Sequence, residues 1–224
     1  LQGLVDRFAL HDAPLYLVGG SVRDALLGRL GNDLDFTTPA RPDVVYSILE
    51  EWAETVWDTG IDYGTVSAAY KGQQIEITTF RSDSYDGDSR NPEVIYGDTL
   101  EGDLVRRDFT VNAMAIELRP DGTREFHDPM GGLQHLADRV LDTPDAPEIS
   151  FHDDPLRMLR AARFAAQVEF DVAKRVRDAM TDMAGEIQRI TVERVQVELN
   201  KLICGTAPWK GIDLLLETGI AEYI

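Results

Sequence analysis

Hydrophobic residues follow two different patterns along the chain, one before and one after a boundary near residues 138–150. In the first part, short apolar or alternating runs are separated by Gly, Pro and Asp, which is typical of strands joined by turns. The predicted strands are 15–18, 33–38, 74–80 and 111–118. Helices are predicted over 22–28, with Ser21 as N-cap, and over 42–54, and a hairpin turn at 120–122. This pattern predicts a small mixed sheet with helices packed on it.

The second part has an almost continuous helical pattern. The predicted helices are 153–168, 171–184, 191–204 and 208–219. Asp153 and Thr191 stand where helix N-caps are expected. The contrast between the two patterns predicts two domains, residues 1–140 with a sheet and residues 141–224 with helices alone.

The segment 81–104 interrupts the sheet pattern. It is polar, rich in Gly and Asp, and has no periodicity, which predicts a surface loop with at most a short helix at its end. Loops of this length in a compact domain are usually functional, although the sequence does not say what this one does.

Composition narrows the class of protein. With 224 residues, 43% of them hydrophobic and 28% charged, most of the chain is expected to fold around a core. No run approaches the roughly 20 apolar residues that a membrane span needs, and the N-terminus lacks a signal-peptide pattern. We therefore expect a cytoplasmic protein with no membrane partner. The single cysteine, Cys204, cannot form an internal disulfide and is predicted to be a buried thiol.

The formal net charge is −18, from 22 basic and 40 acidic residues. Such a balance by itself argues against nucleic acid as a partner, because phosphate binding relies on Lys and Arg. The charge is unevenly distributed, however: residues 1–150 carry 12 basic and 28 acidic side chains, whereas residues 151–224 carry 10 and 12. The negative charge therefore belongs to the sheet-forming part, and the helical part is almost neutral.

Candidate chemistry begins with two acids on one predicted strand. Asp33 and Asp35 are two residues apart, so both carboxylates lie on one face while Leu34 points to the other. Hard oxygen ligands at this spacing suit Mg²⁺, although two solvated acids on an exposed strand would explain the pair alone. Glu76, on another predicted strand, could add a third carboxylate to the same face. Three such acids suit two-metal phosphoryl transfer.

A glycine turn lies a dozen residues before these acids. Gly19, Gly20 and Ser21 open a predicted helix, and Arg23 follows within its first turn. Free backbone N–H groups at a helix start can bind an anion. A phosphate site beside a metal site predicts a nucleoside triphosphate as ligand.

Two arginine-rich motifs follow. RRDFTVNA (106–113) combines two arginines, an acid and an amide, and could equally be a capped turn. In DDPLRMLRAARF (153–164) an acid and three arginines recur at intervals of three, which places them in a curved polar stripe on a helix. A solvated face with ion pairs is the plain explanation. The alternative is recognition of a base, because a carboxylate accepts from the exocyclic amine of cytosine or adenine and a guanidinium donates to ring nitrogen or carbonyl oxygen.

Six motifs in this order carry a family resemblance. They are LVGGSVRDALLGRLGNDLDFTT, IEITTFR, RRDFTVNA, DPMGG, DDPLRMLRAARF and ERVQVEL. Together they resemble the bacterial class II tRNA nucleotidyltransferase and poly(A) polymerase family, the CCA-adding enzymes. The resemblance implies an α+β fold, a mixed-sheet nucleotidyltransferase head domain followed by an all-α neck domain. It also implies Mg²⁺-dependent, template-independent addition of CMP and AMP from CTP and ATP to the 3′ end of tRNA, in CCA addition or repair.

The family pattern also assigns roles to residues. It places metal ligation on Asp33 and Asp35 and a third catalytic carboxylate on Glu76. The residues that it places in nucleotide binding are Gly20, Arg23, Arg107, Asp108, Asn112, Asp154, Arg157, Arg160 and Arg163. Within that set, Asp154 and Arg157 match the pair that reads the incoming base. The residues expected to support the base-reading helix are Glu193, Arg194 and Glu198.

Two departures from the family pattern are visible. Asp153 stands where the family commonly has Glu, and the family continues into body and tail helices that this sequence, which ends at Ile224, does not include. Within the family, a poly(A) polymerase or an enzyme adding only C or only A remains an alternative. Outside it, the alternatives are a small-molecule nucleotidyltransferase and an inactive fragment.

Overall fold

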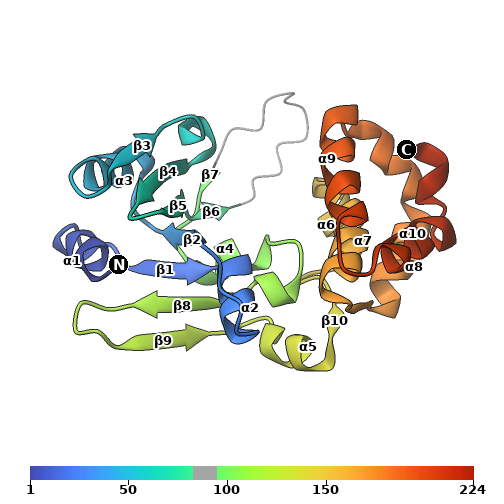
Figure 1. The fold of residues 1–224 in the computed structure, drawn as a ribbon, viewed down its shortest axis with the longest axis horizontal. Coiled ribbons are helices and arrows are strands. Elements are labelled where there is room, and N and C mark those ends of the chain that lie inside the picture. The colour runs from blue at the N-terminus through green and yellow to red at the C-terminus, as the bar shows by residue number, and fades with distance from the viewer. Residues whose placement is uncertain (83–94) are drawn as a thin grey trace. The chain divides into compact units, whose positions relative to one another are not determined.

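The computed structural model describes residues 1–82 and 95–224 and divides them into two compact units (Figure 1). Unit 1 consists of Leu1–Arg107 and Asn112–Met130, and unit 2 consists of Asp108–Val111 and Gly131–Ile224. The division therefore differs from the one expected at residue 140. Among the described residues, no helix is long and apolar enough to cross a membrane.

Unit 1 is built on a seven-stranded sheet with the strand order β3-β4-β5-β2-β1-β8-β9. The strands are β1 (Leu15–Val18), β2 (Asp33–Thr38), β3 (Thr55–Trp57), β4 (Thr65–Tyr70), β5 (Gln73–Thr79), β8 (Ala115–Leu118) and β9 (Arg124–His127). The β2–β5 pair is parallel and the other pairs are antiparallel, so the sheet is mixed as expected. A separate two-stranded ribbon joins β6 (Arg81–Ser82) to β7 (Ile95–Tyr96).

Apolar and polar residues alternate along the strands, so one face of the sheet is apolar and is covered by helices. The apolar positions of β2 and β5 belong to one core with the buried faces of α1 (Gln2–Leu10) and α3 (Pro42–Glu50). Leu34 and Ile75 are almost completely buried there. The polar positions between them therefore lie on the opposite face of the sheet. The remaining helices of the unit are α2 (Gly20–Leu26) and α4 (Leu100–Val105).

The predicted strands 15–18 and 33–38 are confirmed, and 74–80 is found as β5. The strand predicted over 111–118 begins only at Ala115, because Thr110–Asn112 forms a 3-10 turn. The predicted hairpin turn joins β8 to β9, with Gly122 at a φ of 82°. The loop expected over 81–104 contains β6, β7 and α4, and its residues 83–94 lie outside the described part of the chain.

Unit 2 is helical except for one short parallel pair. Its helices are α5 (Gly132–Asp138), α6 (Pro147–Asp153), α7 (Leu156–Val168), α8 (Lys174–Asp182), α9 (Val192–Ile203) and α10 (Pro208–Glu217). The pair joins β10 (Val140–Leu141) to β11 (Asp171–Val172), and it ties the start of the unit to its helices. This pairing explains why the unit begins earlier along the chain than residue 141.

Helix packing in unit 2 depends on one glycine. A Cβ at Gly211 of α10 would lie 2.6 Å from the carbonyl oxygen of Ala162 on α7, so α10 can approach α7 only without a side chain here. Two local expectations are wrong. Asp153 ends α6 instead of capping α7, and Cys204 is exposed because it follows the last turn of α9.

Candidate functional site

Three carboxylates share one face of the sheet in unit 1. Asp33 and Asp35 both lie on β2, and Asp35 stands directly opposite Glu76 of the parallel strand β5. Leu34 and Ile75 occupy the alternate positions and are buried in the core. The structure therefore places on one face of the sheet the three acids that the sequence singled out.

The pKa of Asp35 is raised above its ordinary value of 3.8. Burial is the largest cause, followed by the charge of Glu76, and Asp33 adds to the same direction. Arg107 and Arg23 oppose the shift without cancelling it. A cation held among the three carboxylates would relieve this repulsion, so hard oxygen donors and surplus negative charge both fit a divalent ion such as Mg²⁺.

Ser21 holds the strand of acids against α2. Its side chain is buried, its Oγ accepts from the backbone N–H of Asp35 at 2.9 Å, and it donates to the carbonyl oxygen of Asp33 at 3.3 Å. The helix begins at Gly20, two residues earlier than expected, so Ser21 does not act as its N-cap. No sequence pattern indicates this link, because a serine beside a glycine turn is also a typical cap.

Gly19 and Arg107 fit closely beside the acids. Gly19 has a φ of 67°, and a Cβ there would lie 3.0 Å from Nη1 of Arg107 and 3.8 Å from Oδ2 of Asp35. Both the backbone conformation and the available space therefore require glycine. Arg107 also donates from Nη2 to Oδ2 of the buried Asp103 at 3.1 Å. Asp103 was not predicted as part of the site.

Asp103 lies in a locally positive region. It also accepts from the backbone N–H of Arg81 at 3.3 Å. Burial lowers the pKa of the Arg81 guanidinium, and the charge of Arg106 lowers it further, while Asp103 opposes the shift. Asp103 is therefore contacted by the guanidinium of Arg107 and by the backbone of Arg81, and its charge offsets part of the positive charge of these arginines.

The expected phosphate-binding arginine of α2 has protein partners. Arg23 is only 8% exposed, and its Nη1 donates to Oδ1 of Asn112 at 2.7 Å. Its Nε and Nη2 donate to the neighbouring Asp24. The structure thus uses Arg23 to join α2 to the turn before β8, and it places Gly20 at the first position of the same helix.

In unit 2, Asp154 lies between α6 and α7. Its Oδ1 accepts from the backbone N–H of Leu156 at 3.2 Å, and its Oδ2 lies 3.0 Å from Nη2 of Arg194 on α9. Arg157 follows in the first turn of α7 and donates from Nη1 to Oγ of Ser150 at 2.8 Å. The acid and the arginine expected to read a base are therefore both held by neighbouring groups at the start of one helix.

The other two arginines of α7 form ion pairs inside the unit. Arg160 donates to Oδ2 of Asp108, with Nε at 2.9 Å, and Arg163 lies 2.7 Å from Glu198 of α9. Burial lowers the pKa of Arg160, but Asp108, and to a lesser degree Glu198 and Asp154, raise it more, so the net shift is upward. Arg163 is 9% exposed, which leaves little surface for a nucleotide.

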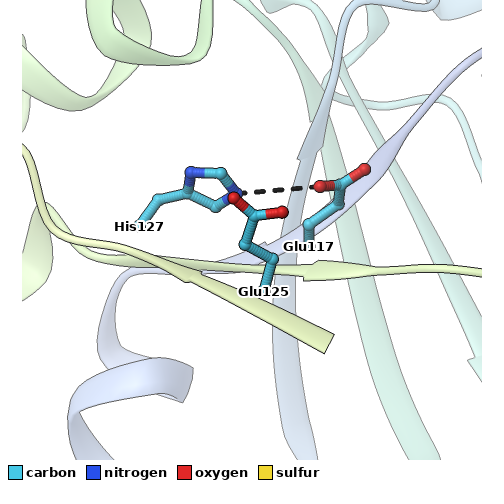
Figure 2. Close-up of side chains that lie close together, drawn as sticks. All are labelled: Glu117, Glu125 and His127. Carbon is cyan, nitrogen blue, oxygen red and sulfur yellow. Dashed lines mark ion pairs between the residues drawn. The ribbon is translucent and has the colours of Figure 1, made fainter. Parts of the chain in front are cut away.

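A second group of possible metal ligands lies on β8 and β9 of unit 1. Figure 2 shows Glu117, Glu125 and His127, whose ligand atoms lie within 4.8 Å of one another. The His127 Nε2 atom is 3.7 Å from Oε2 of Glu117. Arg119 forms ion pairs with both glutamates, so this group already contains a cation, unlike the acids on β2 and β5.

Comparisons with known proteins find related sequences along most of the chain. A family model described as the poly(A) polymerase head domain matches residues 15–142, and one described as the probable RNA- and SrmB-binding site of polymerase A matches residues 169–224. A CCA-adding enzyme of Levilactobacillus brevis is 44% identical over 93% of this chain and 51% of its own length. The chain spans about half the length of the curated relatives that it matches.

Solved structures are similar as well. The CCA-adding enzyme of Bacillus stearothermophilus in complex with CTP has a TM-score of 0.86 and 37% identity, covering 100% of this chain and 52% of that one. A tRNA nucleotidyltransferase complexed with a primer tRNA and an incoming ATP analog has a TM-score of 0.82 and 26% identity, covering 100% and 62%. The expected fold class is thereby confirmed.

Proposed function

Because the chain belongs to the family of the poly(A) polymerase head domain, we propose that it is a tRNA nucleotidyltransferase adding CMP and AMP from CTP and ATP to the 3′ end of tRNA. The observation that carries the proposal is the register that places Asp35 opposite Glu76, with Asp33 on the same face. Solved relatives that contain CTP, or a primer tRNA with an ATP analog, support these substrates.

In the proposed reaction the 3′-hydroxyl of tRNA attacks the α-phosphorus of the nucleotide, and pyrophosphate leaves. Asp33, Asp35 and Glu76 would hold Mg²⁺ through their carboxylate oxygens. A bound ion of this kind lowers the pKa of the attacking hydroxyl and neutralises charge that develops on the phosphoryl oxygens. Ser21 fixes the backbone of both strand acids and so keeps the ligands at their spacing.

The residues around these acids would bind the nucleotide's phosphates and ribose. Gly20 offers backbone N–H at the start of α2, and Arg107 lies beside Gly19 and Asp35. Arg23 acts from a buried position, through its hydrogen bond to Asn112, and keeps α2 in place. Asp108 acts in unit 2, where it holds Arg160.

Selection of the base is assigned to Asp154 and Arg157. An ionised carboxylate accepts hydrogen bonds only, so it favours the exocyclic amine of cytosine or adenine over the carbonyl of uracil or guanine. A guanidinium donates only, which suits the ring nitrogen or carbonyl oxygen next to that amine. Arg160 and Arg163, both in ion pairs, would support this helix from within the unit.

The test is to incubate the protein with Mg²⁺, tRNA lacking its 3′ end, and one radiolabelled nucleoside triphosphate at a time. We expect CMP and then AMP to be incorporated, and UMP and GMP to be rejected. Asp35→Asn should lower turnover by at least about 10³-fold, because one ligand charge at the reacting centre is lost. Repeated addition of AMP alone would identify a poly(A) polymerase instead, and no transfer to tRNA by the unchanged protein would refute the proposal.

A further inference from the structure

An apolar cavity lies in unit 1, on the face of the sheet opposite to the three acids. Its volume is about 220 Å³, and all the residues around it belong to this unit. We propose that the cavity binds a small organic anion, a carboxylate whose apolar body has about six to ten carbon atoms. The inference is independent of the proposed function, because no residue assigned to the metal or to the nucleotide lines the cavity.

The floor of the cavity is formed by three neighbouring strands. Leu34 of β2, Leu17 of β1 and Leu118 of β8 line it, and these strands are adjacent in the sheet. Leu34 lies between Asp33 and Asp35 along β2, so its side chain points to the other face of the sheet. The cavity and the acids are therefore separated by the strand that they share.

The walls of the cavity come from the start of α1 and from the loop between α2 and β2. The apolar residues around it are Leu1, Val5, Leu17, Leu30, Leu34 and Leu118. Nε2 of Gln2 donates to the carbonyl oxygen of Pro120 at 3.0 Å, which ties the start of α1 to the β8–β9 turn at the same end of the sheet (Figure 1). Leu1 and Leu30 are 45% and 49% exposed, whereas Val5 is buried. The cavity is thus closed at the sheet and open to solvent beside Leu1 and Leu30.

One cation lines the cavity without a partner of its own. Arg124 stands opposite Leu118 in the β8–β9 hairpin, so both side chains extend from the same face of the sheet. Arg124 is exposed, and within the described part of the chain it has no ion-pair partner. Arg119, which also lines the cavity, is instead paired with Glu117 and Glu125. Arg124 therefore offers its guanidinium to a ligand.

An apolar cavity beside an unpaired guanidinium specifies the ligand. An apolar cavity of roughly 150 Å³ can hold one benzene ring, so this one accommodates a single ring or a short chain. Pockets for larger molecules of drug size typically measure about 300–1,000 Å³. A carboxylate accepts two parallel hydrogen bonds from a guanidinium, whereas an ammonium group is repelled by it. A small carboxylate with an apolar body satisfies both parts of the site.

The experiment titrates the protein with octanoate, an eight-carbon carboxylate, and follows the backbone N–H signals by NMR. We expect saturable shifts at Leu118, Thr123 and Gln73, which line the cavity. The dissociation constant should lie below about 1 mM, a modest affinity that suits a ligand of about ten non-hydrogen atoms. Acetate has the charge without the chain, and octylammonium has the chain with the opposite charge. Both should bind at least about tenfold more weakly.

Two matched pairs of variants test the two parts of the site separately. Arg124→Gln should lower the affinity for octanoate about three- to tenfold, by loss of one charge-assisted hydrogen bond at an exposed position. Arg41→Gln, which removes an exposed arginine just before α3, is its control. Leu30→Gln should lower the affinity about threefold by loss of apolar contact. Leu27→Gln is the control, because Leu27 is 40% exposed and does not line the cavity.

The absence of saturable shifts at the cavity residues, with octanoate at up to about 10 mM, would overturn the inference. So would equal binding of octanoate and octylammonium, or an equal effect of Arg124→Gln and Arg41→Gln. CTP with Mg²⁺ should leave the octanoate shifts unchanged. Displacement of octanoate by CTP would overturn the inference too, since it would place the carboxylate on the opposite face of the sheet. If octanoate binds in the cavity and the protein adds nothing to tRNA, the inference holds and the proposed function fails.

Discussion

The acids of the two candidate sites have opposite surroundings, although other acids of unit 1, such as Asp103 with Arg107, do form ion pairs. In unit 1, Asp33, Asp35 and Glu76 lie on one face of the sheet, and among the described residues none of them forms an ion pair. In unit 2, the acids next to α7 each meet an arginine: Asp108 meets Arg160, Glu198 meets Arg163, and Asp154 meets Arg194.

Carboxylates without ion-pair partners and carboxylates paired with arginines are suited to different roles. Burial first, and then the charge of Glu76 and Asp33, raise the pKa of Asp35, so a group of carboxylates like this one is suited to binding a cation. Paired charges are already neutralised and fix the helices that carry them. The formal charge of the whole chain, −18, conceals this division, because most of the excess lies in residues 1–150. It therefore gives no argument against a nucleic-acid partner for the near-neutral helical part.

The largest effect on the free energy of unfolding is expected where one side chain of a buried ion pair in unit 2 is removed. Glu198→Gln removes the carboxylate that lies 2.7 Å from the buried Arg163, and breaking a buried pair from one side typically costs about 3–5 kcal/mol of the free energy of unfolding. Urea unfolding measures this, with Glu193→Gln, at an exposed position of the same helix, as the control. A loss below about 1 kcal/mol, comparable to that of an exposed surface pair, would show that unit 2 does not depend on its paired charges.

In unit 1 a substitution is expected to stabilise the protein slightly, in contrast to the loss of stability expected in unit 2. Asp35→Asn removes one of the repelling charges, so in metal-free buffer at pH 7 it should raise the free energy of unfolding by about 1 kcal/mol or less. Because the pKa of Asp35 is raised on folding, the folded state binds its proton more tightly. The unchanged protein should therefore lose stability as the pH rises from about 3.8 through the folded pKa.

Thermal unfolding from pH 4 to pH 7 tests this second prediction. The Asp35→Asn variant should lack the loss of stability with rising pH that comes from Asp35 in the unchanged protein. Mg²⁺ should raise the Tm of the unchanged protein more than that of the variant, because a ligand that binds only the folded state stabilises it. If Asp35→Asn were less stable than the unchanged protein at pH 7 without metal, the description of the three acids as mutually repelling would be wrong.

The alternation of polar and apolar residues predicted several elements of unit 1 but not the tertiary contacts between them. Strict alternation in DLDFTT predicted the bounds of β2 and the shared face of Asp33 and Asp35. The strands β3 and β4 and the helix α1 were missed, because none was separated from its neighbours by a clear change of pattern. The hydrogen bonds of Ser21 to β2 depend on tertiary contact, which periodicity does not encode.

The arginines of α7 show the same limit in unit 2. Their spacing of three predicted a polar stripe, yet Arg160 is paired with Asp108, 52 residues away in sequence, and Arg163 with Glu198. A repeat along one helix says which residues are neighbours on that helix, but not which other element covers them. Those partners decide that Arg163 is buried and that Asp154 is fixed by Arg194.

The smallest effect is expected at the cluster of Glu117, Glu125 and His127, which combines features of both arrangements. Its ligand atoms lie close together (Figure 2), but Arg119 forms ion pairs with both glutamates and so offsets their charge. Arg119→Gln removes that cation and leaves a mixed nitrogen and oxygen ligand set, which suits Zn²⁺. We expect a few-fold gain in Zn²⁺ affinity by calorimetry, and its loss in Arg119→Gln combined with His127→Ala. Because Arg124 lies exposed on the same hairpin, Arg124→Gln is the matched control for lost charge. An equal gain in that control would mean that overall charge, and not the local pairing that separates the two units, governs where a cation binds.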